Sequence, residues 1–100
     1  MVNHSKTIIL QLVLLRSLKQ RAKHAYPLTL EVRVKFNLDV AISSVYEELY
    51  NFRRKGYVTS KWESPTNTRE STKTRNVYAI TQNGLSELKN LEETIKRVLF

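Results

Sequence analysis

The spacing of apolar positions divides the 100-residue chain into helical and extended segments. From Thr7 to His24 the apolar side chains recur at helical spacing and cover most of the circumference, which predicts a first helix over residues 7–24. A helix that is apolar on so many sides needs more than one covering surface, and we expect a second subunit to supply one of them. Pro27 disfavours helical backbone at Tyr26, so the sequence predicts a break there.

The segment at residues 29–36 has two interpretations. Thr29 is a candidate cap for a short second helix from Leu30 to Phe36. The letters "LEVRVKF" also alternate with period two, which fits a strand equally well. A turn follows, and Asp39 is a candidate N-cap for the next helix.

A third helix is predicted over residues 40–55, and Gly56 supplies its C-terminal stop. At 100° per residue its apolar side chains fall within about 60° of one direction. These side chains are Ile42, Val45, Tyr46, Leu49 and Phe52.

Residues 57–81 alternate as two strands joined by the polar loop 64–75, which predicts a hairpin. Thr81 is expected to cap a last helix over residues 82–99. Apolar residues on that helix are spaced three, four and three positions apart, as in a heptad seam. They are Leu88, Leu91, Ile95 and Val98.

The predicted order is helix, short helix, helix, hairpin, helix. This order predicts a mainly α fold with a small β-hairpin, the winged helix-turn-helix, in a single domain over residues 1–100. Residues 40–55 would be its recognition helix, 57–81 its wing and 82–99 a dimerisation helix.

The stretches "SSVYEELYNFRRKGYV" and "RNVYAITQNGLSELKNL" resemble PadR-like transcriptional regulators. The first resembles that family's recognition helix, and the second resembles its second wing strand and the start of its dimerisation helix. The resemblance implies a winged-helix DNA-binding regulator. The same architecture is shared by small winged-helix proteins of archaea and their viruses, which stay an alternative. The matching positions are Ser44, Val45, Tyr46, Leu49, Phe52, Gly56, Val58, Tyr78, Ile80, Thr81, Gly84, Leu85 and Leu88.

Charge and side-chain chemistry both favour double-stranded DNA as the partner. The chain carries a net charge of +8, which suits a polyanion. Opposite the apolar stripe of residues 40–55 lie side chains able to read base edges in a major groove. The predicted DNA-binding residues on the helix are Ser43, Ser44, Glu47, Tyr50, Asn51, Arg54 and Lys55. Those on the wing are Lys61, Arg69, Lys73 and Arg75.

The apolar surfaces of the helices predicted over residues 7–24 and 82–99 indicate a homodimer. Such a dimer would present two recognition helices to a palindromic site. The predicted interface residues are Ile9, Val13, Leu88, Leu91, Ile95 and Val98. Packing of the same seam on its own domain is the alternative. The function predicted is therefore a homodimeric, sequence-specific repressor, with a non-enzymatic protein-interaction module as the alternative.

Other chemistry finds little support in the sequence. There are no cysteines, and His4 and His24 lack partners at metal-ligand spacing, so we expect no metal, no cofactor and no catalysis. Tyr46, Trp62 and Tyr78 could stack on bases, but core packing is the interpretation we favour. The apolar run of residues 8–15 is too short to span a bilayer, and its charges cluster at one end. We therefore expect no membrane partner and a cytoplasmic protein, in the host cytosol if it is viral.

Overall fold

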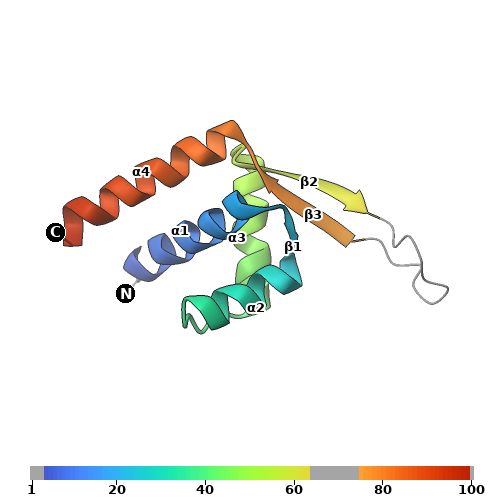
Figure 1. The fold of residues 1–100 in the computed structure, drawn as a ribbon, viewed down its shortest axis with the longest axis horizontal. Helices are drawn as coiled ribbons and strands as arrows, with labels where there is room; N and C mark the ends of the chain where they lie inside the picture. Colours follow the sequence, from blue (N-terminus) through green and yellow to red (C-terminus); the bar gives the residue numbers. More distant parts are fainter. Residues whose placement is uncertain (1–3, 64–74, 100) are drawn as a thin grey trace.

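The computed structural model describes the backbone of residues 4–63 and 75–99 and the side chains of residues 7–62 and 76–98. The helices in this part of the chain are α1 (His4–Gln20), α2 (Ala25–Lys35), α3 (Ile42–Arg54) and α4 (Gln82–Leu99). The strands are β1 (Lys23–His24), β2 (Val58–Glu63) and β3 (Arg75–Ile80). Figure 1 shows the β2–β3 hairpin projecting from one end and α4 extending toward the other. The fold is mainly helical with a small antiparallel sheet, as the sequence predicts.

The sheet has three strands in the order β1–β3–β2, one more than predicted. β3 pairs along its whole length with β2, and Ser60 lies opposite Tyr78. On its other edge β3 pairs with Lys23 and His24, which the sequence assigned to the first helix. Helix α1 ends earlier, at Gln20, so that the chain can turn and form this short pairing.

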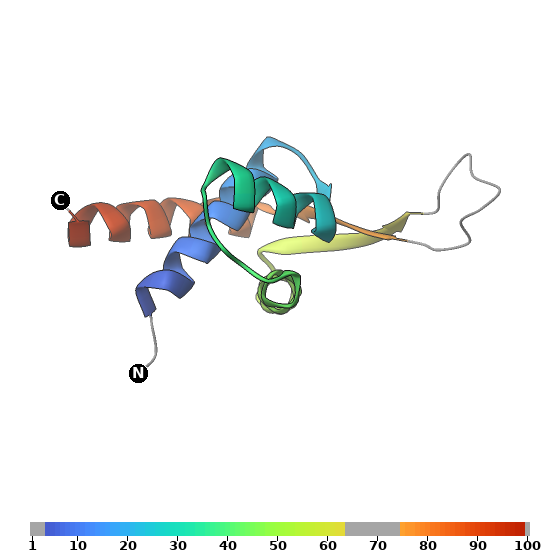
Figure 2. The ribbon, with the colours of Figure 1, turned by 90° about the horizontal axis from the view of Figure 1, so that it is seen from below.

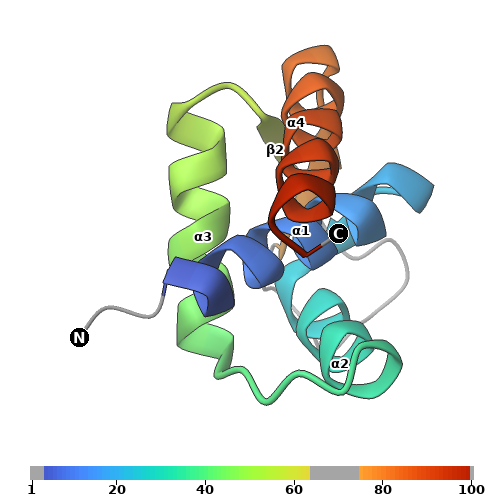
Figure 3. The same ribbon diagram turned by 90° about the vertical axis from the view of Figure 1, so that its left-hand side faces the viewer.

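The core forms where all four helices meet the sheet. In Figure 3, α1 crosses the middle of the molecule with α2, α3 and α4 around it. The chain itself thus covers α1 on several sides, while the expectation that a second subunit covers part of this helix stays a prediction. The central core side chains, each at most 3% exposed, are Leu14, Leu15, Leu18, Leu28, Val32, Val45, Leu49, Val58 and Leu88.

Helix α2 begins at Ala25, before Pro27, so the predicted break at Tyr26 and the strand alternative are both wrong. Pro27 occupies the first turn, where a backbone N–H has no helical acceptor and its loss costs little. Thr29 does not cap the helix; its hydroxyl donates to the Ala25 carbonyl oxygen at 2.8 Å inside α2. The buried positions follow helical spacing, and they are Ala25, Leu28, Thr29 and Val32.

Both ends of α3 depend on the connecting segments. Its N-cap is Ala41, without a side-chain hydrogen bond, so the prediction that Asp39 caps this helix is wrong. The Arg33 Nε instead fixes the preceding loop by donating to the Val40 carbonyl at 2.8 Å. At the other end Gly56 has a φ of 80°, a left-handed conformation that ends the helix as predicted.

Thr81 joins the start of α4 to the turn after α3. Its Oγ1 accepts a hydrogen bond from the Gly84 amide at 3.0 Å, which is the predicted N-cap. The same hydroxyl donates to the Gly56 carbonyl oxygen at 2.6 Å. Gly84 is packed so closely that an added Cβ would overlap the Tyr57 carbonyl oxygen. The wing and α4 are therefore held to the C-terminal end of α3.

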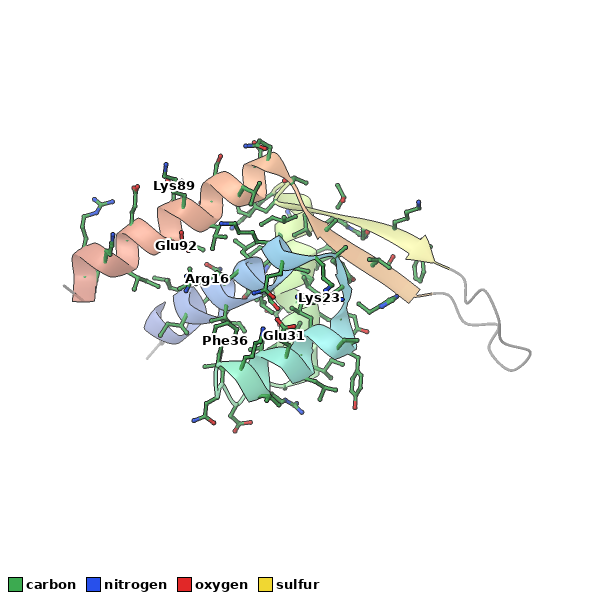
Figure 4. All side chains as sticks on the ribbon, viewed as in Figure 1. Arg16, Lys23, Glu31, Phe36, Lys89 and Glu92 are labelled. Atoms are coloured by element: carbon green, nitrogen blue, oxygen red, sulfur yellow. The ribbon has the colours of Figure 1, made fainter. Side chains whose placement is uncertain are left out.

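A mostly buried ion pair connects α1, β1 and α2. The Lys23 ammonium lies 3.3 Å from the Glu31 carboxylate, with the two side chains 10% and 21% exposed. Lys23 also donates to the Ser17 carbonyl at 2.5 Å, and the Ser17 hydroxyl donates to Glu31. Figure 4 shows Lys23 and Glu31 directed toward each other between α1 and α2. Because an unpaired buried charge is costly, this network favours one position of α2 on α1.

Candidate nucleic-acid interface

Helix α3 presents one face that the described part of the chain leaves uncovered. Val45, Leu49 and Phe52 are buried against the core. Opposite them lie Ser43, Glu47, Tyr50 and Arg54, all predicted DNA-binding residues and all exposed. Two other predicted residues, Ser44 and Asn51, are half-buried at the edge of this face. In Figure 2 α3 is seen end-on beside β2, at the boundary of the molecule.

Tyr50 and Arg54 are one helical turn apart and contact each other. The Arg54 guanidinium carbon lies 5.8 Å from the centre of the Tyr50 ring, within the range of a cation–π interaction. Tyr50 is 55% exposed, so the pair lies on the outer surface of α3. An arginine held by an aromatic ring loses less conformational freedom when it binds a planar acceptor pair such as a guanine edge.

Arg53 belongs to the same surface, although it is not among the binding residues predicted from the sequence. Its Nη1 donates to the Ser60 hydroxyl at 3.0 Å, which connects α3 to β2. The signal in the sequence is the position of Arg53 at the C-terminal end of the predicted helix, directly before Arg54 and Lys55. Arg53 adds a positive charge at the junction between helix and wing.

The wing contributes exposed cations beside α3. Lys55 follows α3 as its C-cap residue, and Lys61 lies on β2 opposite Val77 of β3. Both side chains are exposed. Arg69 and Lys73 lie outside the described residues, as does the side chain of Arg75. Their predicted contacts with DNA therefore stay predictions.

Two of the three aromatic residues expected in the core lie on the surface. Tyr46 is 50% exposed and Trp62 is 66% exposed, so the prediction of core packing is wrong for both. Tyr78 is 7% exposed, which confirms the prediction of core packing for this residue. Helix α3 packs along a narrower strip than its apolar stripe, and Tyr46 falls outside that strip. Trp62 lies near the outer end of β2, where the hairpin extends beyond the core (Figure 1).

The electrostatics of this surface are mainly positive. Arg53, Arg54, Lys55 and Lys61 are exposed there, and Glu47 is an exposed acid among them. Glu48 is directed to the other side, because its carboxylate accepts a hydrogen bond from Gln11 of α1 at 3.3 Å. The pKa of Tyr78 is raised, mainly by burial and further by Tyr46, although Arg53 and a hydrogen bond with Asn76 oppose the rise.

The predicted dimer residues fall into two groups. Val13, Leu88 and Leu91 are at most 8% exposed within one chain, so they are part of its own core and offer a partner little surface. Their assignment to an interface stays a prediction. Ile9 and Val98 are 40% and 76% exposed, and Ile95 is half-buried. Ile95 lines a groove of about 430 Å³ between α1 and α4, where Arg16 and Glu92 form an ion pair at 3.3 Å (Figure 4).

Other kinds of site have no support in the described part of the chain. No group of three His, Cys, Asp or Glu side chains lies close enough there to hold a metal ion. Among the helices described, none is long and apolar enough to cross a membrane.

This structure is that of a winged helix-turn-helix protein. It has helices α2 and α3, the β2–β3 hairpin that follows them in the chain, and the uncovered basic face of α3. The protein family can be stated more specifically than this fold class. A family model described as the transcriptional regulator PadR-like family matches residues 14–90, so the chain belongs to that family. The resemblance inferred from residues 43–91 is thereby confirmed. A search of curated proteins found no match.

Solved structures agree with this fold. The chain is similar to a PadR-like transcriptional regulator from Bacillus cereus, with a TM-score of 0.78 and 18% identity over 96% of this chain and 89% of that one. A transcriptional regulator from Clostridium thermocellum gives 0.77 and 20% over 96% and 95%. Bacillus subtilis PadR, solved in complex with operator DNA, gives 0.70 and 19% over 82% of this chain and 45% of that chain.

Proposed function

We propose that this protein is a homodimeric repressor that binds double-stranded DNA in a sequence-specific way through α3 and the wing. The observation that carries the proposal is the exposed face of α3, where Arg54 stacks on Tyr50 and Ser43 and Glu47 lie alongside. An α-helix fits the major groove, where Arg pairs with guanine, Ser with several bases and Glu with cytosine. Lys55 and Lys61 flank the helix and suit the phosphate backbone.

The dimer is supported by what α4 leaves exposed. Beyond Leu91 the helix extends away from the core (Figure 1), and its apolar residues Ile95 and Val98 are only partly covered. The adjacent groove along α1 is large enough to receive apolar side chains of a second copy. A two-fold dimer would place two α3 helices in successive major grooves about 34 Å apart, which favours a palindromic site. Size-exclusion chromatography with light scattering tests the dimer, and a monomer at micromolar concentration would refute it.

Repression by occlusion is the simplest consequence of such binding, since a dimer on a promoter blocks access to it. The proposed activity is binding alone, without catalysis. It takes place in the cytoplasm of a bacterial or archaeal cell, or of the host cell if the gene is viral, because that compartment holds the DNA.

In vitro selection of duplexes from a random pool tests the proposal. We expect an enriched palindromic sequence, and a pool that shows no enrichment would refute specific binding.

If a dimer neutralises about six phosphates, log affinity falls with log salt concentration at a slope of about −5. Lys61→Ala should weaken binding to selected and random duplexes by the same factor, and the slope should become shallower by about 1 for each phosphate that is no longer neutralised.

A protein-interaction module remains a second candidate because α2 carries an exposed apolar stripe. Tyr26, Leu30 and Val34 follow one another at four-residue intervals and are 60%, 40% and 81% exposed. Such a stripe is typical of a surface that another protein covers. A chain that has no affinity for any duplex at low salt would favour this function over DNA binding.

A further inference from the structure

A cleft of about 460 Å³ lies between the start of α2, the middle of α3 and the β2–β3 sheet. Four aromatic side chains line it, and three of them are exposed: Tyr26 of α2, Tyr46 of α3 and Trp62 of β2. They are 60%, 50% and 66% exposed. Aromatic rings that converge on a cleft from separate elements offer flat faces on which another ring can stack. The volume is within the range of ordinary small-molecule sites.

The inner side of the cleft contains an acceptor that lacks a donor. Tyr78 and Asn76 of β3 line it, and Asn76 lies close enough to the Tyr78 phenol to lower its pKa. The Asn76 Oδ1 is buried and has no hydrogen-bond partner among the residues that the structure describes. A buried acceptor without a partner destabilises a fold, so each such atom calls for an explanation. A bound molecule with an N–H or O–H group would supply the missing donor.

Duplex DNA does not fit this cleft as well as a small molecule does. The DNA backbone presents phosphate and sugar oxygens, which accept hydrogen bonds and therefore cannot pair with Asn76 Oδ1. Lys, Arg, Asp and Glu are absent from the described lining, so no charged side chain among the described residues forms a wall of the cleft. A neutral aromatic molecule with a donor group matches both the walls and the acceptor.

We propose that this cleft binds a neutral, planar aromatic molecule carrying an N–H or O–H donor, stacked against Tyr46 and Trp62 and hydrogen bonded to Asn76. Binding there competes with DNA, a consequence that rests on the proposed function. Tyr46 lies one helical turn from both Ser43 and Tyr50 and shares their exposed face. A molecule that covers Tyr46 therefore occupies space that a duplex on α3 would need.

The single tryptophan of the chain, Trp62, lines the cleft and makes the test direct. Its fluorescence is followed while benzimidazole, which has one N–H, or 1-methylbenzimidazole, which has none, is added. We expect a saturable change with benzimidazole and about tenfold weaker binding of the methylated compound, because it cannot donate the hydrogen bond. Equal binding of the two compounds, or no saturable change with either, would overturn the site.

Variants separate the site from unspecific binding. Asn76→Leu should weaken benzimidazole binding about tenfold and abolish the preference for it over the methylated compound. Tyr46→Ala removes a half-exposed ring, so the fold is retained if Asn76→Leu proves unstable, and it should also weaken binding at least fivefold. Val34→Ser, on an exposed position of α2 outside the cleft, is the matched control and should bind as the wild type does. Retention of full affinity in both cleft variants contradicts the proposal.

Competition is measured with a duplex obtained by selection. Benzimidazole at ten times its dissociation constant should reduce the apparent DNA affinity about tenfold. Saturable binding without any change in DNA affinity would overturn the competition. If no duplex binds at all, the proposed function and the competition fail together, while the fluorescence titration still decides whether the cleft is a site.

Discussion

The buried pair of Lys23 and Glu31 allows the most quantitative prediction about the fold. Glu31→Leu removes the carboxylate but leaves the ammonium, 10% exposed, with the Ser17 carbonyl and hydroxyl as its described partners. Breaking a fully buried ion pair typically costs about 3–5 kcal/mol. Glu31 is 21% exposed and Lys23 keeps two hydrogen bonds, so we expect a decrease of about 2–3 kcal/mol in the free energy of unfolding.

Urea unfolding at a fixed protein concentration measures this decrease, since a dimer makes stability depend on concentration. With a slope of about 1 kcal/mol per molar for a chain of this size, the midpoint should fall by about 2–3 M. The double variant Lys23→Met with Glu31→Leu should recover most of the stability, because no buried charge remains.

The exposed pair of Arg16 and Glu92 is the control for this experiment. Its side chains are 56% and 40% exposed, so Glu92→Gln should cost at most about 0.5 kcal/mol. If Glu31→Leu costs no more than Glu92→Gln, or if the double variant is less stable than the single one, the reasoning about the buried charge is refuted.

Three further predictions concern the junction between α3, the wing and α4. Gly84→Ala should reduce the free energy of unfolding by about 1–3 kcal/mol in urea titrations, since the added Cβ overlaps the Tyr57 carbonyl oxygen; an unchanged midpoint would contradict this close packing. Thr81→Val should cost about 1–2 kcal/mol by the same measurement, because α4 loses its N-cap and the hydroxyl no longer donates to the Gly56 carbonyl; a neutral effect would mean that the cap contributes nothing. The raised pKa of Tyr78 means that the unfolded chain loses this proton at a lower pH than the folded chain does, so stability is complete below about pH 10 and falls above it. Urea titrations across that range should show a smaller fall for Tyr78→Phe, and an identical fall would refute the assignment.

The parts of the fold that the sequence predicted are those determined by local chemistry. Gly56 ends α3 because glycine tolerates a positive φ, and Thr81 begins α4 because its hydroxyl reaches a free amide. Both effects act within a few residues of the chain. The order of the elements followed from such signals, although the element at residues 29–36 was left open between a helix and a strand.

The parts of the fold that the sequence did not predict depend on contacts between distant segments. Strand β1 is two residues long and exists because β3 lies beside it, which no local pattern of Lys23 and His24 reveals. Periodicity shows that Tyr46 shares a side of α3 with buried residues, but it does not show how wide the covered strip is. The aromatic cleft was missed for the same reason, since Tyr46 and Trp62 were expected inside the core.

The proposed function depends on the claim that the exposed face of α3 reads DNA sequence, and one comparison of two arginine variants tests it. Arg54→Ala and Arg97→Ala remove the same charge from exposed positions, one on α3 and one on the last turn of α4. Electrophoretic shifts with a selected duplex and a scrambled one should show Arg54→Ala weakening the selected complex about 10- to 100-fold and the scrambled complex far less. Arg97→Ala should weaken both slightly and equally. If the two variants behave alike on both duplexes, α3 does not read the sequence and the central claim is wrong.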